Sequence, residues 1–410
     1  MGLTVGPLVG HPVGPLVGPL GTAPRPGTPI NVLALSHDPQ SSVAQIRLLR
    51  PLQLLVDAGA LALRARGFHQ LRRSDTHWAD IVILQRATGA RQLAAMGQWQ
   101  AAGIPVIYEI DDLLTEPAEH LTQNDALRRA QPALRALLAG ANRITASTAP
   151  LVDEMRACGP PVSWVPNGIA TFNGPQAHHG AAGPISLIVA SSDRQQLDAL
   201  GDALAALLAP GRPRAADALA IDLWGVGPVA AALGERGLPH QVLPLLPPDR
   251  FLSTLARLAN PVGLIPLDDS RFSGCKSVVK FLDYASAGLP SLCVDRPPYR
   301  GLVQHGLTGW LCADDAEGWR QGLNALCGSA ELRSCLGQAA RADALARHSL
   351  AQMAQAWQQV LNDTLRDAAS LRPRQVAPFT RRTVDALADA IQAPVQLLRE
   401  RNRQRLRRRQ

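Results

Sequence analysis

From Ile30 onward, short apolar runs alternate with helical patterns along most of the chain. Apolar runs bounded by turn residues predict β-strands. Their near-continuous apolar composition is typical of strands that are buried on both faces of a parallel sheet. The expected strands span residues 30–36, 80–85, 105–111, 143–148 and 162–168, and then 185–192, 221–227, 240–246, 261–268, 289–295 and 309–314.

Amphipathic stretches separate these runs and predict helices. The expected helices span residues 42–58, 89–102, 123–139 and 149–158, then 195–208, 228–236, 248–258, 276–287 and 316–327, followed by a helical run over 332–367. The alternation predicts an α/β fold with doubly wound, largely parallel sheets. Because it stops at a Gly- and Pro-rich stretch and then restarts, we expect two Rossmann-like domains that face each other across a cleft. A ligand is expected where the carboxyl ends of both sheets meet.

These patterns divide the chain into six segments. The first is rich in Gly and Pro and repeats VGPL three times, which predicts a disordered leader, with a partner-binding repeat as the alternative. The segments are the leader 1–29, the N-terminal domain 30–168, a linker 169–184, the C-terminal domain 185–345, a final helix 346–371 and a tail 372–410.

The basic character of the protein is confined to this tail. The whole chain carries a net charge of +8, and residues 372–410 contain 11 Arg against three acidic residues, so residues 1–371 sum to zero. The tail is either a solvated basic segment or a contact with an anionic membrane surface. No nucleic-acid partner is expected, since no aromatic residues interleave the terminal Arg residues.

Composition further predicts a soluble, cytoplasmic protein without cofactors. Hydrophobic residues make up 46% of the 410 positions, yet no apolar run approaches the ~20 residues that cross a bilayer. The N-terminus lacks the pattern of a secretory signal. Six cysteines form no CxxC pair and have no His at zinc spacing, so we expect reduced thiols and no metal site.

Lysine usage marks one window of the chain. Of 41 basic residues only Lys276 and Lys280 are lysines, and both lie in FSGCKSVVKFLDYASAGLPSLCVDRPPY (272–299). A helix that begins here offers unpaired N–H groups to a diphosphate, and Gly274 allows close backbone approach. Lys276, Ser277 and Lys280 supply charge and donors, and Asp283 is placed to accept bonds from ribose hydroxyls. The alternative is an amphipathic helix with two solvated lysines.

This window resembles the donor-binding segment of GT-B glycosyltransferases of the large retaining, glycogen-synthase-like superfamily (glycosyl transferases group 1). Their helix carries two Glu eight positions apart before A-x-G-x-P. Here Asp283 falls on the second Glu and Cys275 on the first, which is a departure. The order Lys276-Ser277-x-x-Lys280-x-x-Asp283-Tyr284 is similar to a sub-branch with K-S-x-x-K-x-x-E-Y. The resemblance implies metal-independent transfer from a nucleotide-diphosphate sugar, with retention, in bacterial polysaccharide biosynthesis.

Further motifs extend the resemblance over about residues 30–365. Gly225 and Gly227 resemble a G-x-G-P turn near the donor base, and Ser192 and Arg194 follow the first strand of the donor domain, 185–345. In the other half, expected to bind the acceptor, the segment with Ser41, Ser42 and Arg47 is similar to S-x-x-x-R-x-x-x-P, and these residues are expected to face the cleft. The final helix, with Trp357, is expected to cross back onto the N-terminal domain, as GT-B enzymes do.

The segment PVIYEIDDLLTEPAEH (105–120) resembles the V-V-Y-x-x-D-D-L segment of the same sub-branch. We expect Asp111 and Asp112 to be catalytic, one by hydrogen bonding a donor or acceptor hydroxyl, unless both are structural. Lys276 is the third expected catalytic residue, since a fixed cation stabilises the departing diphosphate.

The sequence therefore predicts a hexosyltransferase-like enzyme whose acceptor is a glycan, a lipid-linked sugar or a protein. Two alternatives stay open. A catalytically inactive relative that binds or assembles is favoured by Cys275 and Asp111 at positions where related enzymes have Glu and His. A nucleotide-sugar epimerase shares the fold and would convert free donor without an acceptor.

Overall fold

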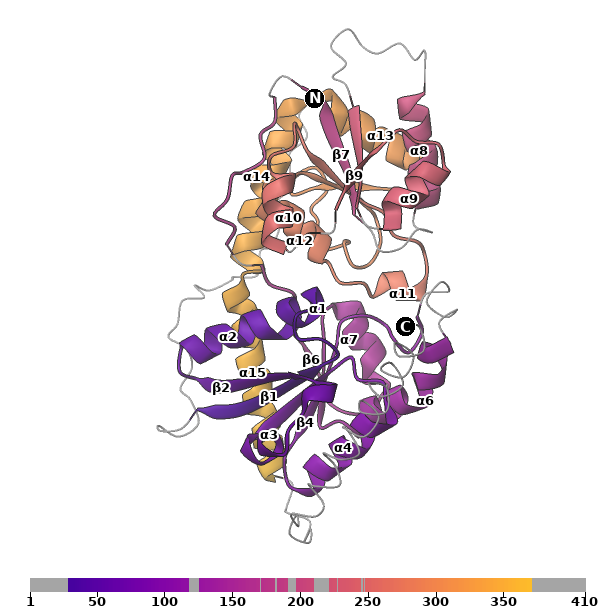
Figure 1. Ribbon diagram of the computed structural model, residues 1–410. Helices are drawn as coiled ribbons and strands as arrows, with labels where there is room; N and C mark the ends of the chain where they lie inside the picture. Colours follow the sequence, from indigo (N-terminus) through magenta and orange to yellow (C-terminus); the bar gives the residue numbers. More distant parts are fainter. Residues whose placement is uncertain are drawn as a thin grey trace, which may run out of the picture.

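The computed structural model describes residues 29–117, 125–169, 171–180, 183–190, 197–209, 221–226, 228–244, 246 and 248–370. Two parallel sheets of six strands organise this part of the chain, with the orders β2-β1-β3-β4-β5-β6 and β12-β11-β10-β7-β8-β9 (Figure 1). The expected leader and tail lie outside the described residues.

The N-terminal sheet consists of β1 (Ile30–Ser36), β2 (Leu61–Gly67), β3 (Ile81–Gln85), β4 (Val106–Ile110), β5 (Arg143–Ala146) and β6 (Val162–Trp164). The helices of this half are α1 (Ser42–Ala44), the π-helical turn η1 (Gln45–Leu49), α2 (Arg50–Asp57), the 3-10 turn η2 (Phe68–Gln70), α3 (Arg73–Trp78), α4 (Ala90–Ala101), α6 (Asp125–Gly140) and α7 (Ala149–Arg156). All strand pairs are parallel.

The C-terminal sheet consists of β7 (Ile185–Ala190), β8 (Ile221–Val226), β9 (Gln241–Leu243), β10 (Val262–Ile265), β11 (Ser291–Val294) and β12 (Trp310–Cys312). Its helices are α8 (Asp198–Leu208), α9 (Pro228–Glu235), α10 (Pro248–Leu255), α11 (Arg271–Gly274), α12 (Val279–Ser286), α13 (Ala316–Gly328) and α14 (Ala330–Arg347). This sheet is also parallel throughout. Its strand order reverses between β7 and β10, where a doubly wound sheet opens a crevice at its carboxyl end.

Alternate residues of the N-terminal strands enter two separate cores, because side chains of a strand point to opposite faces. Leu33 and Leu35 pack with residues of α4, α6 and α7, whereas Val32 and Ala34 pack with residues of α2 and of the last helix. Burial on both faces is why these strands are apolar almost without interruption.

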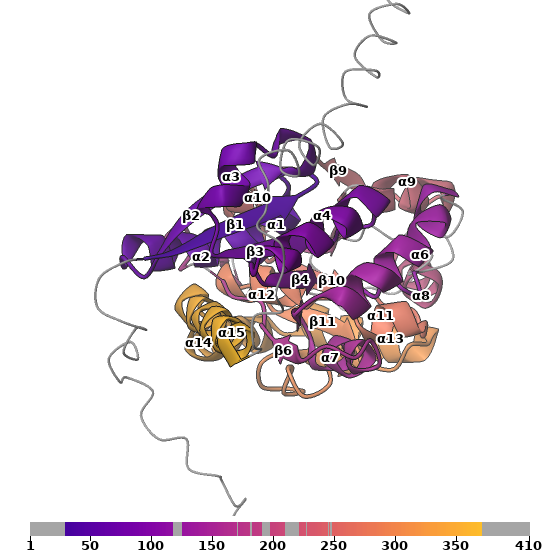
Figure 2. The ribbon, with the colours of Figure 1, turned by 90° about the horizontal axis from the view of Figure 1, so that it is seen from below.

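The last helix, α15 (Leu350–Ser370), belongs to the N-terminal domain in space although it follows α14 in sequence. Met353, Trp357 and Leu361 lie in the same buried cluster as α2, and the Trp357 indole N–H donates to the carbonyl of Arg47 at 2.9 Å. Figures 1 and 2 show α14 and α15 running along one side of both domains. No helix of the described residues has the length and apolar character to cross a membrane.

A close approach fixes α12 against the C-terminal sheet. A Cβ atom on Gly263 of β10 would lie 2.2 Å from the Tyr284 ring of α12, so only glycine admits that ring. The helix itself begins at Val279, three residues later than the expected 276, so Lys276 and Ser277 lie in the turn that precedes it.

Candidate functional site

The turn between α11 and α12 lies between the two domains, and the N-terminal domain holds it. Phe272 and Cys275 are buried in the same apolar cluster as α4, α6 and α7. The Thr148 hydroxyl, at the carboxyl end of β5, donates to the carbonyl of Cys275 at 2.9 Å. Arg271 forms ion pairs with Glu116 at 2.8 Å and Glu154 at 2.5 Å.

The donor-binding candidates Lys276, Ser277 and Lys280 are half-buried in this turn and the first turn of α12. Ser277 Oγ accepts a hydrogen bond of 2.6 Å from Asn167 Nδ2. Lys276 Nζ lies 5.2 Å from the centre of the Phe272 ring. At Gly274 no atom lies within 4 Å of the site of a Cβ, so the backbone is open there to a ligand.

Asp283, one turn further along α12, borders a cavity of about 280 Å³ that both domains line. Arg50 of the N-terminal domain and Ser286 of α12 also line it, as does Phe172 of the linker between the domains. Burial raises the pKa of Asp283 to about 7, although the charges of Arg50 and Lys280 act in the opposite direction. The carboxyl is half-buried and enclosed by the narrow cavity.

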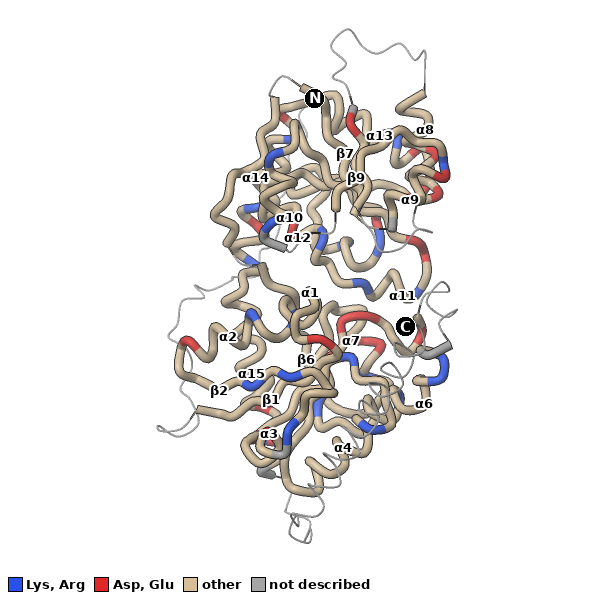
Figure 3. Tube along the Cα trace, in the orientation of Figure 1, with Lys and Arg blue, Asp and Glu red and all other residues tan. Residues whose placement is uncertain are grey.

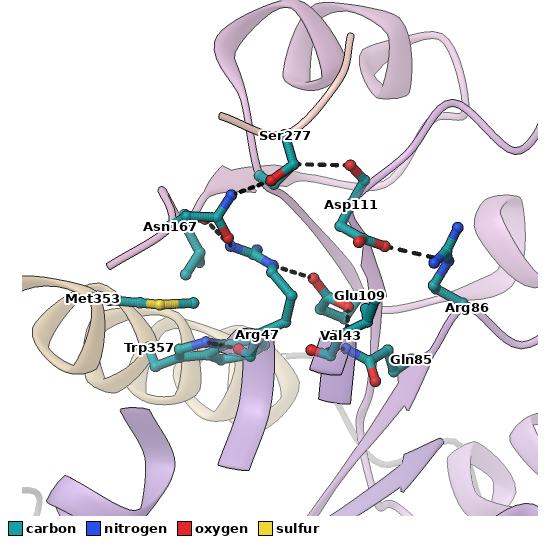
Figure 4. Close-up of polar contacts among 12 residues, drawn as sticks. Val43, Arg47, Gln85, Arg86, Glu109, Asp111, Asn167, Ser277, Met353 and Trp357 are labelled. Carbon is teal, nitrogen blue, oxygen red and sulfur yellow. Dashed lines mark hydrogen bonds and ion pairs between the residues drawn. The ribbon is translucent and has the colours of Figure 1, made fainter. Parts of the chain in front are cut away.

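Arg47 lies inside the N-terminal domain, where its side chain is only 2% exposed. Its Nε donates to Glu109 Oε1 at 2.7 Å, and its Nη1 donates to the carbonyl of Val165 at 2.7 Å and to Asn167 Oδ1 at 2.9 Å (Figure 4). Gln85 Nε2 donates to the other oxygen of Glu109 at 2.9 Å. The expectation that Arg47 faces the cleft is therefore wrong: the π-helical turn directs it at a buried carboxylate, which compensates its charge.

The two serines expected beside Arg47 lie at the start of the same helical run. Ser41 Oγ accepts from Ala44 N at 3.3 Å and so caps α1, and its hydroxyl donates to the carbonyl of Asp38 at 2.7 Å. Ser42 is exposed. Ser41 thus has a structural partner, and Ser42 is open to solvent.

Asp111 and Asp112 follow β4 and share one cation, Arg86, at the end of the neighbouring β3. Arg86 Nη2 donates to Asp112 Oδ2 at 2.9 Å, and its Nε lies 3.3 Å from Asp111 Oδ1. Burial raises the pKa of Asp111 to about 7, against the charge of Arg86. The pKa of His37, after β1, is lowered by burial and by the same Arg86. Arg86 has a left-handed φ of 49°, a strained conformation for a residue of its size.

Three of the expected donor-site residues, Ser192, Arg194 and Gly227, lie outside the described residues. Gly225 is described, and packing explains why a glycine stands there: a Cβ atom would lie 2.6 Å from Ala230 Cα in α9. Within the described ranges, no group of three or more His, Cys, Asp or Glu side chains is arranged to hold a metal ion.

A second, more open cavity of about 310 Å³ is bordered by Gly274 and Cys275. Charged side chains of both signs line it, among them Glu154, Asp268, Asp269, Arg271 and Arg296. Figure 3 shows that acidic and basic positions gather where the two domains face each other.

Sequence reasoning missed two residues of this region, Arg86 and Asn167. A signal for Arg86 was present, since it directly follows the expected strand 80–85, and the carboxyl ends of parallel strands meet at one edge of the sheet. Asn167 lies in the sequence Val165-Pro166-Asn167-Gly168 at the domain boundary, but nothing in the sequence links it to Ser277.

Two Rossmann-like domains with parallel sheets, a cleft lined by both and a last helix that returns to the first domain define the GT-B fold. The predicted fold class is thereby confirmed. Among solved structures, the chain is similar to sucrose-phosphate synthase from Thermosynechococcus elongatus, with a TM-score of 0.60 and 14% identity over 83% of this chain and 100% of that one.

It is also similar to HepE of Anabaena in complex with UDP and glucose, with a TM-score of 0.58 and 13% identity over 82% of this chain and 100% of that one. S. aureus TarM aligns with a TM-score of 0.52 and 11% identity over 69% of this chain and 55% of that one. No family model and no curated protein matches the sequence.

Proposed function

We propose that this protein is a glycosyltransferase that transfers a sugar from a nucleotide-diphosphate sugar to an acceptor hydroxyl. The observation that carries the proposal is the position of Lys276 and Ser277, which stand in the turn before α12, between the two domains. Asp283 of the same helix borders the cavity that both domains line. The similarity to HepE, which was solved with UDP and glucose and with UDP-glucose, supports a nucleotide-sugar as the donor.

In the proposed reaction the bond between the anomeric carbon and the β-phosphate oxygen breaks, and its electron pair leaves with the nucleoside diphosphate. The acceptor oxygen forms the new bond to that carbon and gives its proton to the departing phosphate. Lys276, the Ser277 hydroxyl and the first N–H groups of α12 face the growing negative charge, which lowers the barrier because the charge is largest in the transition state. These cations and donors allow transfer without a metal.

Asp111 is proposed to bind a hydroxyl of the donor sugar or of the acceptor. Its Oδ1 lies 3.3 Å from Arg86 Nε but accepts no well-formed hydrogen bond from any described residue, although the carboxyl is only 6% exposed. A buried acceptor is costly to leave without a hydrogen bond, and a sugar hydroxyl would supply one. Asp112 is held by Arg86 and is proposed to orient the loop that carries Asp111.

The resemblance to group 1 glycosyltransferases favours a hexosyl donor, retention of configuration and a glycan, lipid-linked or protein acceptor, as in bacterial polysaccharide biosynthesis. The Arg-rich sequence of 372–410 favours a cytoplasmic enzyme that touches an anionic membrane surface, where lipid-linked acceptors reside.

Calorimetric titration with UDP, GDP, ADP and TDP tests the proposal. We expect saturable binding of one nucleotide and about 10- to 100-fold weaker binding in Lys276→Ala, the range for a hydrogen bond to a charged group. Arg366→Ala is the control, because Arg366 is exposed on α15 and paired with Asp363.

Binding that is absent across the four nucleotides, or equal in both variants, would contradict the proposed donor site. Nucleotide binding without transfer to any acceptor would instead favour an inactive binding relative, and conversion of free donor without an acceptor would favour an epimerase. The anomeric configuration of the product, measured by NMR, tests retention.

A further inference from the structure

Asn167 connects the donor-binding turn of the C-terminal domain to the interior of the N-terminal domain. It lies at the domain boundary, is 1% exposed, and contacts one residue of each domain through its amide. Its Oδ1 accepts from Arg47 Nη1 at 2.9 Å, and its Nδ2 donates to Ser277 Oγ at 2.6 Å (Figure 4).

The chemistry of Arg47 fixes the orientation of this amide. A guanidinium has only donors, so the atom of Asn167 that faces Arg47 must be the carbonyl oxygen. The NH₂ group must then face Ser277, whose oxygen accepts. The Ser277 hydroxyl proton is consequently not used by Asn167 and is free to point toward an anionic ligand in the turn.

The buried ion pair of Arg47 and Glu109 makes the Asn167 amide a stronger hydrogen-bond donor to Ser277. Arg47 is itself fixed by Glu109 at 2.7 Å and by the carbonyl of Val165 at 2.7 Å. A cation that donates to the amide oxygen polarises the amide, so its N–H becomes a better donor to Ser277, and hydrogen bonds in such a chain reinforce one another. Each link makes the Ser277 O–H a stronger donor at its far end.

We propose that Asn167 is a positioning residue for donor binding: it orients the Ser277 hydroxyl toward the diphosphate, so that donor affinity depends on the buried Arg47–Glu109 pair of the other domain. This inference rests on the proposed function, because it takes a nucleoside diphosphate as the ligand of the turn. In this role Asn167 acts through Ser277 and not by a contact of its own with the diphosphate.

The test is a double-mutant cycle on Asn167→Asp and Ser277→Ala. Aspartate keeps an acceptor for Arg47 but has no N–H for Ser277, so the Ser277 hydroxyl turns to donate to the new carboxylate. Each variant is expected to bind the nucleoside diphosphate about tenfold more weakly, the loss of one hydrogen bond to a charged group. The double variant is expected to lose no more than either single one, since both changes remove the same donor.

The probes are the tightest-binding member of the UDP, GDP, ADP and TDP panel and its unphosphorylated nucleoside. Affinity for the nucleoside should stay unchanged in all variants, because it lacks the diphosphate; a general loss of structure would weaken both probes. Asn142→Asp is the matched control: its Oδ1 accepts from Val106 N at 2.8 Å and Gln100 Nε2 at 2.9 Å, far in sequence from the turn. Asn167→Ser, whose neutral side chain is too short to bridge the two contacts, is a second variant with the same expected loss.

Two results separate this inference from the proposed function. If the wild-type protein binds a diphosphate but Asn167→Asp and Asn167→Ser bind it equally well, or if the losses multiply to about a hundredfold in the double variant, the positioning role is overturned and the enzyme assignment stands. If the wild-type protein binds no member of the panel, the proposed function fails, and the positioning role fails with it.

Discussion

Replacing Asp111 with asparagine is expected to change how the stability of the protein depends on pH. The carboxyl of Asp111 is buried at the end of β4, and its Oδ1 lies 3.3 Å from Arg86 Nε. Burial raises the pKa of Asp111 to about 7, more than the charge of Arg86 lowers it. The folded protein therefore favours the protonated acid, and Asp111→Asn is nearly isosteric with that neutral form.

The stability of the folded protein falls with rising pH because the pKa of Asp111 is higher in the folded than in the unfolded chain. In the unfolded chain an aspartic acid titrates near 3.9, so between this value and 7 the folded state holds a proton that the unfolded state has released. The stability that neutral Asp111 contributes is complete below about pH 4 and is lost as the pH rises through 7. Linkage arithmetic with these pKa values gives a loss of roughly 2 to 3 kcal/mol between about pH 5 and pH 8.

Urea unfolding of both proteins at pH 5 and pH 8 measures this loss. Tryptophan fluorescence and circular dichroism should be followed together, because a two-domain protein need not unfold in one step. We expect the free energy of unfolding of Asp111→Asn, relative to the wild type, to increase by roughly 2 to 3 kcal/mol from the lower to the higher pH. Asp112→Asn is the comparison: it removes a carboxylate that is 23% exposed and pairs with Arg86, and whose charge itself raises the pKa of Asp111, so only a smaller increase in the same direction is expected.

Either of two outcomes would refute the expected role of Asp111. If the difference between Asp111→Asn and the wild type is the same at both pH values, Asp111 does not titrate in this range, and Arg86 must hold it ionised in the folded protein. If instead Asp112→Asn shows the same increase, the effect comes from Arg86 losing a partner and not from the proton on Asp111.

Two further predictions concern packing and the contact between the domains. Gly263→Ala should lower the free energy of unfolding by about 1 to 3 kcal/mol, because the new methyl group would meet the Tyr284 ring. The control Gly97→Ala, at an open position inside α4, should raise the free energy of unfolding by about 0.5 to 1 kcal/mol. Equal effects of the two variants in chemical denaturation would contradict the packing argument. Arg271→Ala should leave stability almost unchanged, since Arg271 is exposed and water screens its ion pairs. It should nevertheless speed hydrogen exchange of the amides in 271–277; unchanged exchange would show that these pairs do not hold the turn.

The parallel sheets could be predicted because most of their strands are apolar on both faces. The strand β2 lacks this pattern and was therefore missed. It is an edge strand that pairs only with β1, and its sequence LALRARG places Arg64 and Arg66 at alternate positions. Both arginines reach the buried carboxylate of Asp75, at 3.2 and 3.4 Å. A strand with one neighbour and a charged row does not give the continuous apolar signal that identified the others.

The site was predictable only where it follows from strand ends. Asp111 ends the expected strand 105–111 and was singled out by the resemblance of 105–120 to a glycosyltransferase segment. Because the carboxyl ends of parallel strands meet at one edge, its place at that edge could be predicted. The direction of Arg47 was not predictable, because its partner Glu109 lies 62 positions away and a π-helical turn leaves no mark in the apolar pattern. The contact of Asn167 with Ser277 spans 110 positions, and no local pattern encodes it.

The contacts between the domains also explain why a cysteine fits at position 275, where the segment that this window resembles has the first Glu. Cys275 is buried among apolar residues of the N-terminal domain, and its pKa is raised to about 12 by burial and by the nearby charge of Glu154. A glutamate at this position would place a carboxylate in an apolar cluster beside an existing negative charge, which is costly without a partner. The small, neutral thiol instead lets the turn dock, so that Thr148, Asn167 and Arg271 can fix it. In this chain the N-terminal domain therefore shapes the turn through packing and hydrogen bonds at the point where the resemblance would place a charged side chain.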